Sequence, residues 1–167
     1  MSGERESDLW ETPQSIVDWV RYQAGWGAFD FDAAATETNR KAPRWAGRCS
    51  SDTTDGLLGE WVGSTVWLNP PYSNQGIWLA RAAREGQTRR VAALVMPSFD
   101  ARYWRPAVWE AATEIWLLEG RIAFERGGKS FPGGNVRSCV VLYAPRNPQA
   151  IVQRIEPKVR YLRPFVV

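Results

Sequence analysis

Residues Asn69, Pro70, Pro71 and Tyr72 are the part of the sequence with the clearest chemical potential. The two prolines fix their own backbone angles, push the residues before them into extended geometry and offer no N–H. A rigid turn of this kind presents the Asn69 amide oxygen, a backbone carbonyl and an aromatic ring. Two neighbouring acceptors match an exocyclic amine with its two hydrogens, and the ring can stack on a flat heterocycle. A proline turn with an incidental tyrosine is the alternative interpretation.

Regular elements are expected on both sides of this turn. The apolar stretch 62–68 predicts a strand that runs directly into the turn, and the continuous apolar run 90–96 predicts an interior strand. A helix over 75–85 connects the two strands. Near the N-terminus, Thr12 is expected to cap a helix with Pro13 at its first position.

Between these helices the sequence predicts one short strand and a long irregular stretch. Residues 29–32 alternate as a strand ending at Asp32, and the small residues 33–35 are expected to form a turn. Residues 36–60 are polar and contain several glycines, so we expect irregular structure there.

The C-terminal part predicts a helix over 103–112 and strands over 113–119 and 136–144. These last two strands are connected by a loop, which predicts an antiparallel pair at the end of the fold. Alternation of strands and helices indicates an α/β domain with an open, mostly parallel sheet covered on both faces. We expect a single domain, residues 1–167, with a core of about 8–144 and a basic, partly helical tail over 145–167. Ligands of such sheets bind at the carboxyl ends of the strands, where Asp32 and Asn69 are expected.

Composition excludes several other chemistries. The 167 residues include no histidine, which excludes a Ser-His-Asp triad, a histidine general base and most zinc enzymes. Two cysteines cannot form a tetrahedral thiolate site or a disulfide framework, so we expect no metal site and a reducing, cytoplasmic setting. The longest apolar run, 91–96, is far too short to span a membrane, so no membrane association is expected.

The charge of the chain is unevenly distributed. The net charge is +3, while residues 145–167 contain five basic residues and one acidic residue, a net charge of +4. A second basic cluster lies within 81–90. Such clusters attract a polyanion such as nucleic acid, although each alone is also compatible with a solvated surface.

The Asn-Pro-Pro-Tyr turn after an apolar strand resembles motif IV of amino-group methyltransferases that use S-adenosylmethionine. Residues 10–20 look like their motif X, and residues 29–35 look like the strand and turn of motif I. The order of segments over about residues 8–143 is similar to the phage DNA N6-adenine methyltransferases, the small Dam-like family of bacteriophages. The resemblance implies a Rossmann-like methyltransferase fold that acts on DNA, with double-stranded DNA expected, in the cytoplasm of a host bacterium.

Three departures from the family pattern indicate a truncated version of that fold. Residues 33–36 replace the usual glycine-rich loop. Only 22 residues separate Asp32 from Asp55, so one cofactor strand is expected to be missing or very short. The tail beyond residue 145 leaves no room for a target-recognition domain, which favours short or relaxed sequence specificity.

The resemblance implies roles for the proline turn itself. The Asn69 side-chain oxygen and the Pro70 carbonyl would hold the N6 amine of adenine, with Pro71 stiffening the turn. Tyr72 would stack on a base that has been turned out of the duplex. Catalysis would then be alignment for in-line displacement, with no covalent enzyme intermediate.

The resemblance also implies a cofactor site for S-adenosylmethionine. Asp32 would bind the methionine ammonium, Thr12 its carboxylate, and Asp55 the adenine amine. The alternatives are an Asp32 that holds the following turn, a Thr12 that only caps a helix, and an Asp55 that only shapes a turn. The remaining candidate cofactor residues are Pro13, Ala33, Ala34, Asn39 and Asn69 itself.

On the substrate side, the candidates are Tyr72, Ser73, Phe131, Arg121 and Arg137. Phe131 would offer a second face to the base or be tucked into the core, and the two arginines would bind phosphate or the cofactor carboxylate. Two other functions stay open: methylation of an RNA base or a glutamine amide, and a non-catalytic, basic nucleic-acid-binding protein. The sequence leaves the oligomeric state open between monomer and homodimer.

Overall fold

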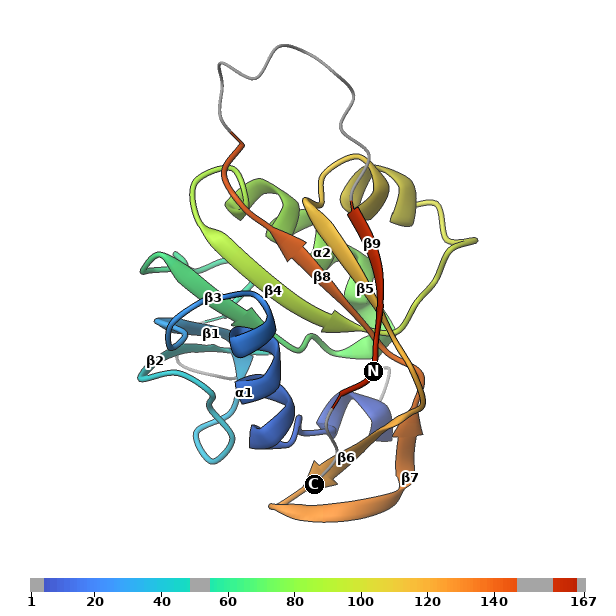
Figure 1. Ribbon diagram of the computed structural model, residues 1–167. Helices are drawn as coiled ribbons and strands as arrows, with labels where there is room; N and C mark the ends of the chain where they lie inside the picture. The colour runs from blue at the N-terminus through green and yellow to red at the C-terminus, as the bar shows by residue number, and fades with distance from the viewer. Residues whose placement is uncertain (1–4, 49–54, 147–157, 165–167) are drawn as a thin grey trace.

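The computed structural model describes residues 5–48, 55–146 and 158–164, and the side chains of residues 131–135 lie outside that description. Within these ranges, seven strands form one sheet in the order β2-β1-β3-β4-β8-β5-β9, and β6 and β7 form a separate hairpin (Figure 1). The strands of the sheet are β1 (Phe31–Ala35), β2 (Arg44–Gly47), β3 (Thr65–Leu68), β4 (Arg90–Val95), β5 (Glu114–Leu118), β8 (Cys139–Tyr143) and β9 (Lys158–Leu162). The hairpin consists of β6 (Ile122–Arg126) and β7 (Lys129–Val136).

The helices are few and short. They are α1 (Gln14–Gln23), α2 (Gln75–Glu85), and the single-turn elements η1 (Glu6–Leu9), η2 (Tyr72–Asn74) and η3 (Arg105–Trp109). None of the helices in the described ranges is long and apolar enough to cross a membrane.

The sheet is parallel except for one strand. Strand β8 runs antiparallel to both of its neighbours, β4 and β5, whereas the pairs β1·β2, β1·β3, β3·β4 and β5·β9 are parallel. The expected antiparallel pair of the last two predicted strands is therefore confirmed. Strand β8 is inserted in the interior of the sheet, because the β6–β7 hairpin returns the chain between β4 and β5.

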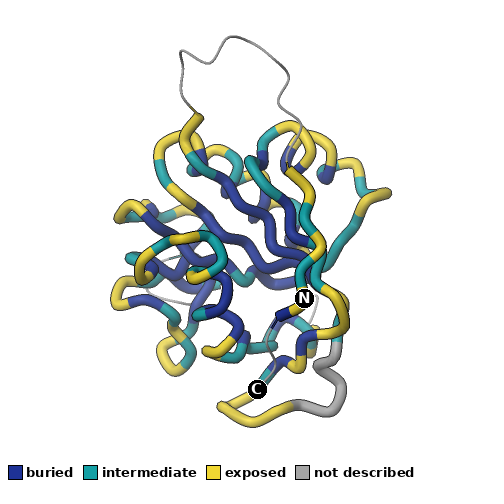
Figure 2. The backbone as a smooth tube through the Cα atoms, in the orientation of Figure 1, coloured by how far each residue is buried: buried dark blue, intermediate teal, exposed yellow. Residues whose placement is uncertain are grey.

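Alternation along the strands produces two cores. In β3, Val66 and Leu68 pack with α2 on one face, and Trp67 packs with α1 on the other. Strands β4 and β8 alternate in the same way because neighbouring strand residues point to opposite faces. The central strands are accordingly buried along most of their length (Figure 2), and the predicted sheet covered on both faces is confirmed.

The N-terminal region differs from the sequence prediction at two points. Helix α1 begins at Gln14 with Pro13, in extended geometry, as its N-cap residue, and no cap hydrogen bond comes from a side chain. The expectation that Thr12 caps this helix is therefore wrong. Strand β1 continues through Ala35, because its small residues are all buried in the sheet, so the predicted turn over 33–35 is also wrong.

Three further elements correct the sequence prediction. Strand β2 lies within the stretch that was expected to be irregular, and it pairs in parallel with β1. A strand between Asp32 and Asp55, which the sequence leaves in doubt, is thus present and very short. The expected helix over 103–112 is reduced to η3, and the described part of the tail forms β9 instead of helix.

Candidate active site

A small cavity of about 10 Å³ opens at the carboxyl ends of β1 and β3. It gathers five of the candidate residues, and four further residues complete its wall. The candidates are Thr12, Asp32, Ala34, Asn39 and Asn69, and the others are Trp10, Lys41, Arg48 and Trp67. The parallel pairing of β1 with β3, in which Asp32 lies opposite Trp67, explains why segments far apart in the sequence meet here.

The Asn69 carboxamide is hydrogen-bonded through its nitrogen but, among the described residues, not through its oxygen. Its Nδ2 donates to the Trp10 carbonyl oxygen at 3.1 Å, which fixes the orientation of the amide. Its Oδ1 is buried and accepts no hydrogen bond from any described residue. Pro70 and Pro71 beneath it are buried, so the turn is held rigidly. A buried acceptor without a donor is costly unless a ligand satisfies it.

The Asp32 carboxylate accepts hydrogen bonds from backbone N–H groups of the segment that follows it. Its Oδ2 accepts from the Lys41 backbone N–H at 2.8 Å, and its Oδ1 accepts from the Ala34 N–H at 3.3 Å. The carboxyl is almost fully buried, and this burial raises its pKa from 3.8 to about 6, against the lowering effect of those two N–H groups and of the charges on Lys41 and Arg48. The alternative that Asp32 shapes the following segment is therefore realised, and the same carboxylate also lines the cavity.

Three more buried polar groups of the cavity wall have no partner among the described residues. They are the Thr12 hydroxyl, the Arg48 Nε and the Trp10 Nε1. The Arg48 Nη1 donates to the Asp8 carbonyl oxygen, which anchors the guanidinium at the cavity. Together with Asp32, the wall thus offers one carboxylate and several donors, which suits a ligand that carries both an ammonium and a carboxylate.

Asp55 lies at the same edge of the sheet without lining the cavity. Its Oδ1 accepts from the Leu57 N–H at 2.7 Å, so it shapes a turn, which is the alternative role that the sequence leaves open. Gly56 presses this turn against the ends of β1 and β2: its N–H donates to the Gly47 carbonyl at 2.8 Å, and a Cβ at this position would lie 1.9 Å from the Ala33 oxygen.

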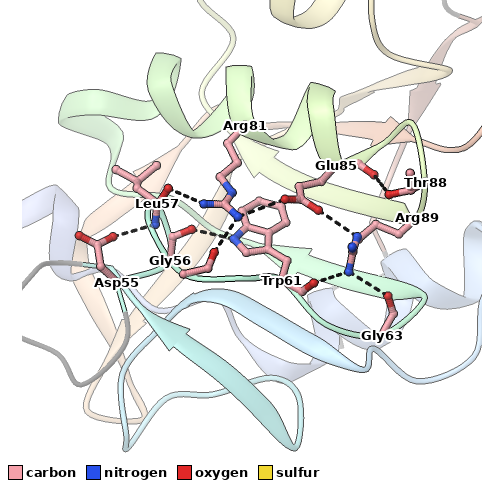
Figure 3. A network of polar contacts seen from close by, with 10 residues as sticks. Asp55, Gly56, Leu57, Trp61, Gly63, Arg81, Glu85, Thr88 and Arg89 are labelled. Atoms are coloured by element: carbon pink, nitrogen blue, oxygen red, sulfur yellow. Dashed lines mark hydrogen bonds and ion pairs between the residues drawn. The ribbon is translucent and has the colours of Figure 1, made fainter.

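Two arginines, Arg81 in α2 and Arg89 in the turn after it, fasten the loop that carries Asp55 (Figure 3). Arg81 donates to the carbonyls of Leu57 and Gly59, and its guanidinium lies 5.2 Å from the centre of the Trp61 ring. Arg89 donates to the carbonyls of Trp61 and Gly63. Both arginines pair with the same Glu85, at 3.1 and 2.9 Å. Helix α2 therefore positions the Asp55 turn, although no charge pattern in the sequence pointed to this role.

Tyr72 is more buried than its predicted role of stacking on a base allows. Only 7% of the residue is exposed, and the ring lies edge-on to Trp10 at 6.0 Å and to Phe124 at 5.8 Å. Burial raises the pKa of its hydroxyl well above 10. Stacking on a base therefore requires one of the covering rings to move. The neighbouring Ser73 is exposed, and its N–H donates to Asp8 Oδ1 at 2.9 Å.

The other substrate candidates lie away from the cavity. Arg121 and Arg137 are exposed and line a separate groove beyond the ends of β4 and β5. Phe131 belongs to β7, but its side chain lies outside the described part of the structure. Sequence reasoning missed three residues of the site, Asp8, Lys41 and Arg48. The last two fall in the stretch that was expected to be irregular, so nothing connected them with Asp32.

Comparison with known proteins identifies the family of the chain. The family described as DNA N-6-adenine-methyltransferase (Dam) matches residues 2–159. A DNA N-6-adenine-methyltransferase of Escherichia phage T1 is 29% identical over 154 residues, covering 81% of this chain and 62% of the relative. An enzyme of the same name from Haemophilus phage HP1 is 24% identical over 147 residues, covering 86% of this chain and 82% of the relative.

The chain thus spans 62% of the length of the T1 relative, whereas the family match extends over almost all of its own residues. On the strength of that match, the chain belongs to the DNA N-6-adenine-methyltransferase (Dam) family.

Proposed function

We propose that this protein transfers a methyl group from S-adenosylmethionine to the N6 amine of adenine in DNA. The single observation that carries the proposal is the Asn69 side chain, whose Oδ1 is buried, has no partner among the described residues, and lines the same cavity as Asp32. An amine that donates to this oxygen and to the Pro70 carbonyl would satisfy a buried acceptor.

The residues of the cavity fit the methionine end of the cofactor. The Asp32 carboxylate would bind the ammonium, and the Thr12 hydroxyl and the Arg48 Nε would donate to the carboxylate. The cavity of about 10 Å³ is far smaller than the about 300–1,000 Å³ of sites for whole ligands, so its wall would have to open to admit that end. The adenosine end would extend toward Asp55, which lies at the same edge of the sheet.

The protein contributes alignment to the reaction. The bound cofactor supplies an electrophilic methyl group on a sulfonium. Two acceptors on the amine hydrogens fix the amine plane, so that its nitrogen lone pair faces the donor carbon. No general base is needed if the proton leaves to solvent after the transfer, which is consistent with a chain that contains no histidine.

The adenine must leave the base stack before its amine can reach Asn69. We expect duplex DNA as the substrate, and short or relaxed sequence specificity. Within the described residues, the elements outside the sheet are short helices and one hairpin, which leaves few side chains for reading base edges. Since both relatives come from phages, we place the activity in the cytoplasm of an infected bacterium.

The proposal is tested by incubating the protein and labelled S-adenosylmethionine with DNA, RNA and protein acceptors. We expect label in DNA, no incorporation by Asn69→Ala, and full incorporation by Asn74→Ala, which removes an exposed amide on the same turn. Calorimetry should show that both variants bind the cofactor. Incorporation only into RNA or protein would replace the proposed substrate, and an absence of cofactor binding by the wild type would indicate a non-catalytic protein.

A further inference from the structure

A second concavity of about 390 Å³ lies beyond the carboxyl ends of β4 and β5. It is much larger than the cavity beside Asn69. Apolar, basic and hydroxyl side chains line this groove, among them those of Phe99, Leu117, Leu118, Arg121, Arg137 and Ser138. One end of this groove adjoins the proline turn, because Ser138 lies beside the Tyr72 hydroxyl.

Phe99 provides a supported and open aromatic ring in this groove. It is 54% exposed, although it is a large apolar side chain. Its ring meets the buried Trp104 edge-on at 5.4 Å and lies 6.2 Å from Trp109, with the two planes 30° apart. The two tryptophans support the ring, and its exposed part can receive a flat ligand at little cost in side-chain entropy.

The loop that carries Phe99 is tied to the start of α2, just after the proline turn. Gln75 is buried, and its Nε2 donates to the Met96 carbonyl at 2.9 Å, to Ser98 Oγ at 3.0 Å and to the Tyr103 hydroxyl at 2.8 Å. Its Oε1 accepts from the Met96 N–H at 3.1 Å. One amide thus ties the loop that carries Phe99 to the start of α2.

The two arginines of the groove carry charges that are not neutralised. Among the described residues, neither Arg121 nor Arg137 makes an ion pair, and no carboxylate lines the groove. The nearby Glu119 is engaged by Arg163, whose Nε donates to it at 3.0 Å. Two free guanidiniums beside an open ring are complementary to a phosphate next to a base.

We propose that this groove binds a nucleotide of the substrate strand that has left the duplex stack, with its base against Phe99 and its phosphate between Arg121 and Arg137. This inference rests on the proposed function.

The test measures the affinity of a short, fluorescent single-stranded DNA oligonucleotide by anisotropy, together with KM for DNA methylation. Phe99→Ala should weaken binding by about tenfold or more, the range expected for loss of one base–aromatic stack. Phe99→Trp keeps a ring and should retain wild-type affinity. Tyr22→Ala removes a ring that is 80% exposed on α1 and should change nothing.

The arginines are tested through salt dependence. The double variant Arg121→Ala, Arg137→Ala should bind more weakly and reduce the magnitude of the slope of log affinity against log salt by about 0.7, since the one single-strand phosphate that the two arginines hold contributes about 0.7. Arg84→Ala removes an exposed arginine from α2 and should leave affinity and slope unchanged.

Two outcomes separate this inference from the function on which it rests. If the wild type methylates DNA while Phe99→Ala and the double arginine variant behave like Tyr22→Ala and Arg84→Ala, the groove assignment is overturned and the proposed function stands. If the wild type methylates nothing, but binds the oligonucleotide more tightly than the Phe99→Ala variant does, the groove assignment is supported and the enzymatic proposal fails.

Discussion

Replacing Asp32 with asparagine should stabilise the ligand-free protein at neutral pH while weakening its binding of S-adenosylmethionine. Burial raises the pKa of Asp32 from 3.8 to about 6. A shift of about two units corresponds to about 3 kcal/mol, at 1.36 kcal/mol per unit. An asparagine has one acceptor oxygen, which would keep the 2.8 Å bond from Lys41 and lose the 3.3 Å bond from Ala34 at a cost of about 1 kcal/mol. The net gain is about 2 kcal/mol.

The sign of the effect depends on pH. Between the unfolded pKa of 3.8 and the folded pKa of about 6, the folded protein holds a proton that the unfolded chain has lost. The contribution of Asp32 to the free energy of unfolding therefore falls as the pH rises through this window and stays low above it. Below about pH 4 both states are protonated, so the variant loses its advantage and retains only the cost of the missing hydrogen bond.

Urea unfolding followed by tryptophan fluorescence at about pH 8 and about pH 4 measures these differences. Asp100→Asn, which neutralises an exposed carboxylate, is the matched control and should show neither effect. Calorimetry at neutral pH should show weaker cofactor binding by Asp32→Asn, because an ammonium would lose its charged partner. Equal destabilisation at both pH values, with unchanged cofactor affinity, would refute the reasoning.

Three other substitutions test separate parts of the site. Thr12→Val should not lower stability, because the buried hydroxyl has no partner among the described residues, and should weaken cofactor binding by about 1 kcal/mol in calorimetry; unchanged affinity would remove Thr12 from the cofactor site. Gly56→Ala should lower the urea midpoint by an amount equivalent to about 1–3 kcal/mol, because its Cβ would meet the Ala33 oxygen, whereas Gly27→Ala has open space and should be tolerated; equal midpoints would contradict the packing described. Arg81→Ala should cost about 2 kcal/mol and speed hydrogen exchange in the loop it anchors, and unchanged exchange there would show that the loop is held by other contacts.

The parts of the fold that could be predicted from the sequence depend on local signals. Strand β4 is a continuous apolar run, and α2 shows helical periodicity, so both were found with nearly correct bounds. The turn at Asn69 could be predicted because proline restricts the backbone in any context. Its place beside Asp32 followed from the general rule that parallel strands end at one edge of the sheet.

The elements that escaped prediction depend on contacts between distant residues. Strand β9 forms only because it pairs with β5, where Glu114 lies opposite Lys158 and accepts from Arg160 at 3.2 Å. Strand β2 has only four residues, which is too short for an alternation of apolar and polar residues to be recognised, and its neighbours in the sequence are polar. The aromatic character of Tyr72 was visible in the sequence, but its burial depends on contacts with Trp10 and Phe124, which lie far from it in the sequence.

The central claim is that the free Asn69 oxygen receives an adenine amine. The most direct measurement is mass spectrometry of the nucleosides from DNA treated with the protein and S-adenosylmethionine. We predict N6-methyladenine with the wild type, and none with Asn69→Ala even at saturating cofactor. A methyl group on a different base or atom, or equal N6-methyladenine from both proteins, would contradict the account.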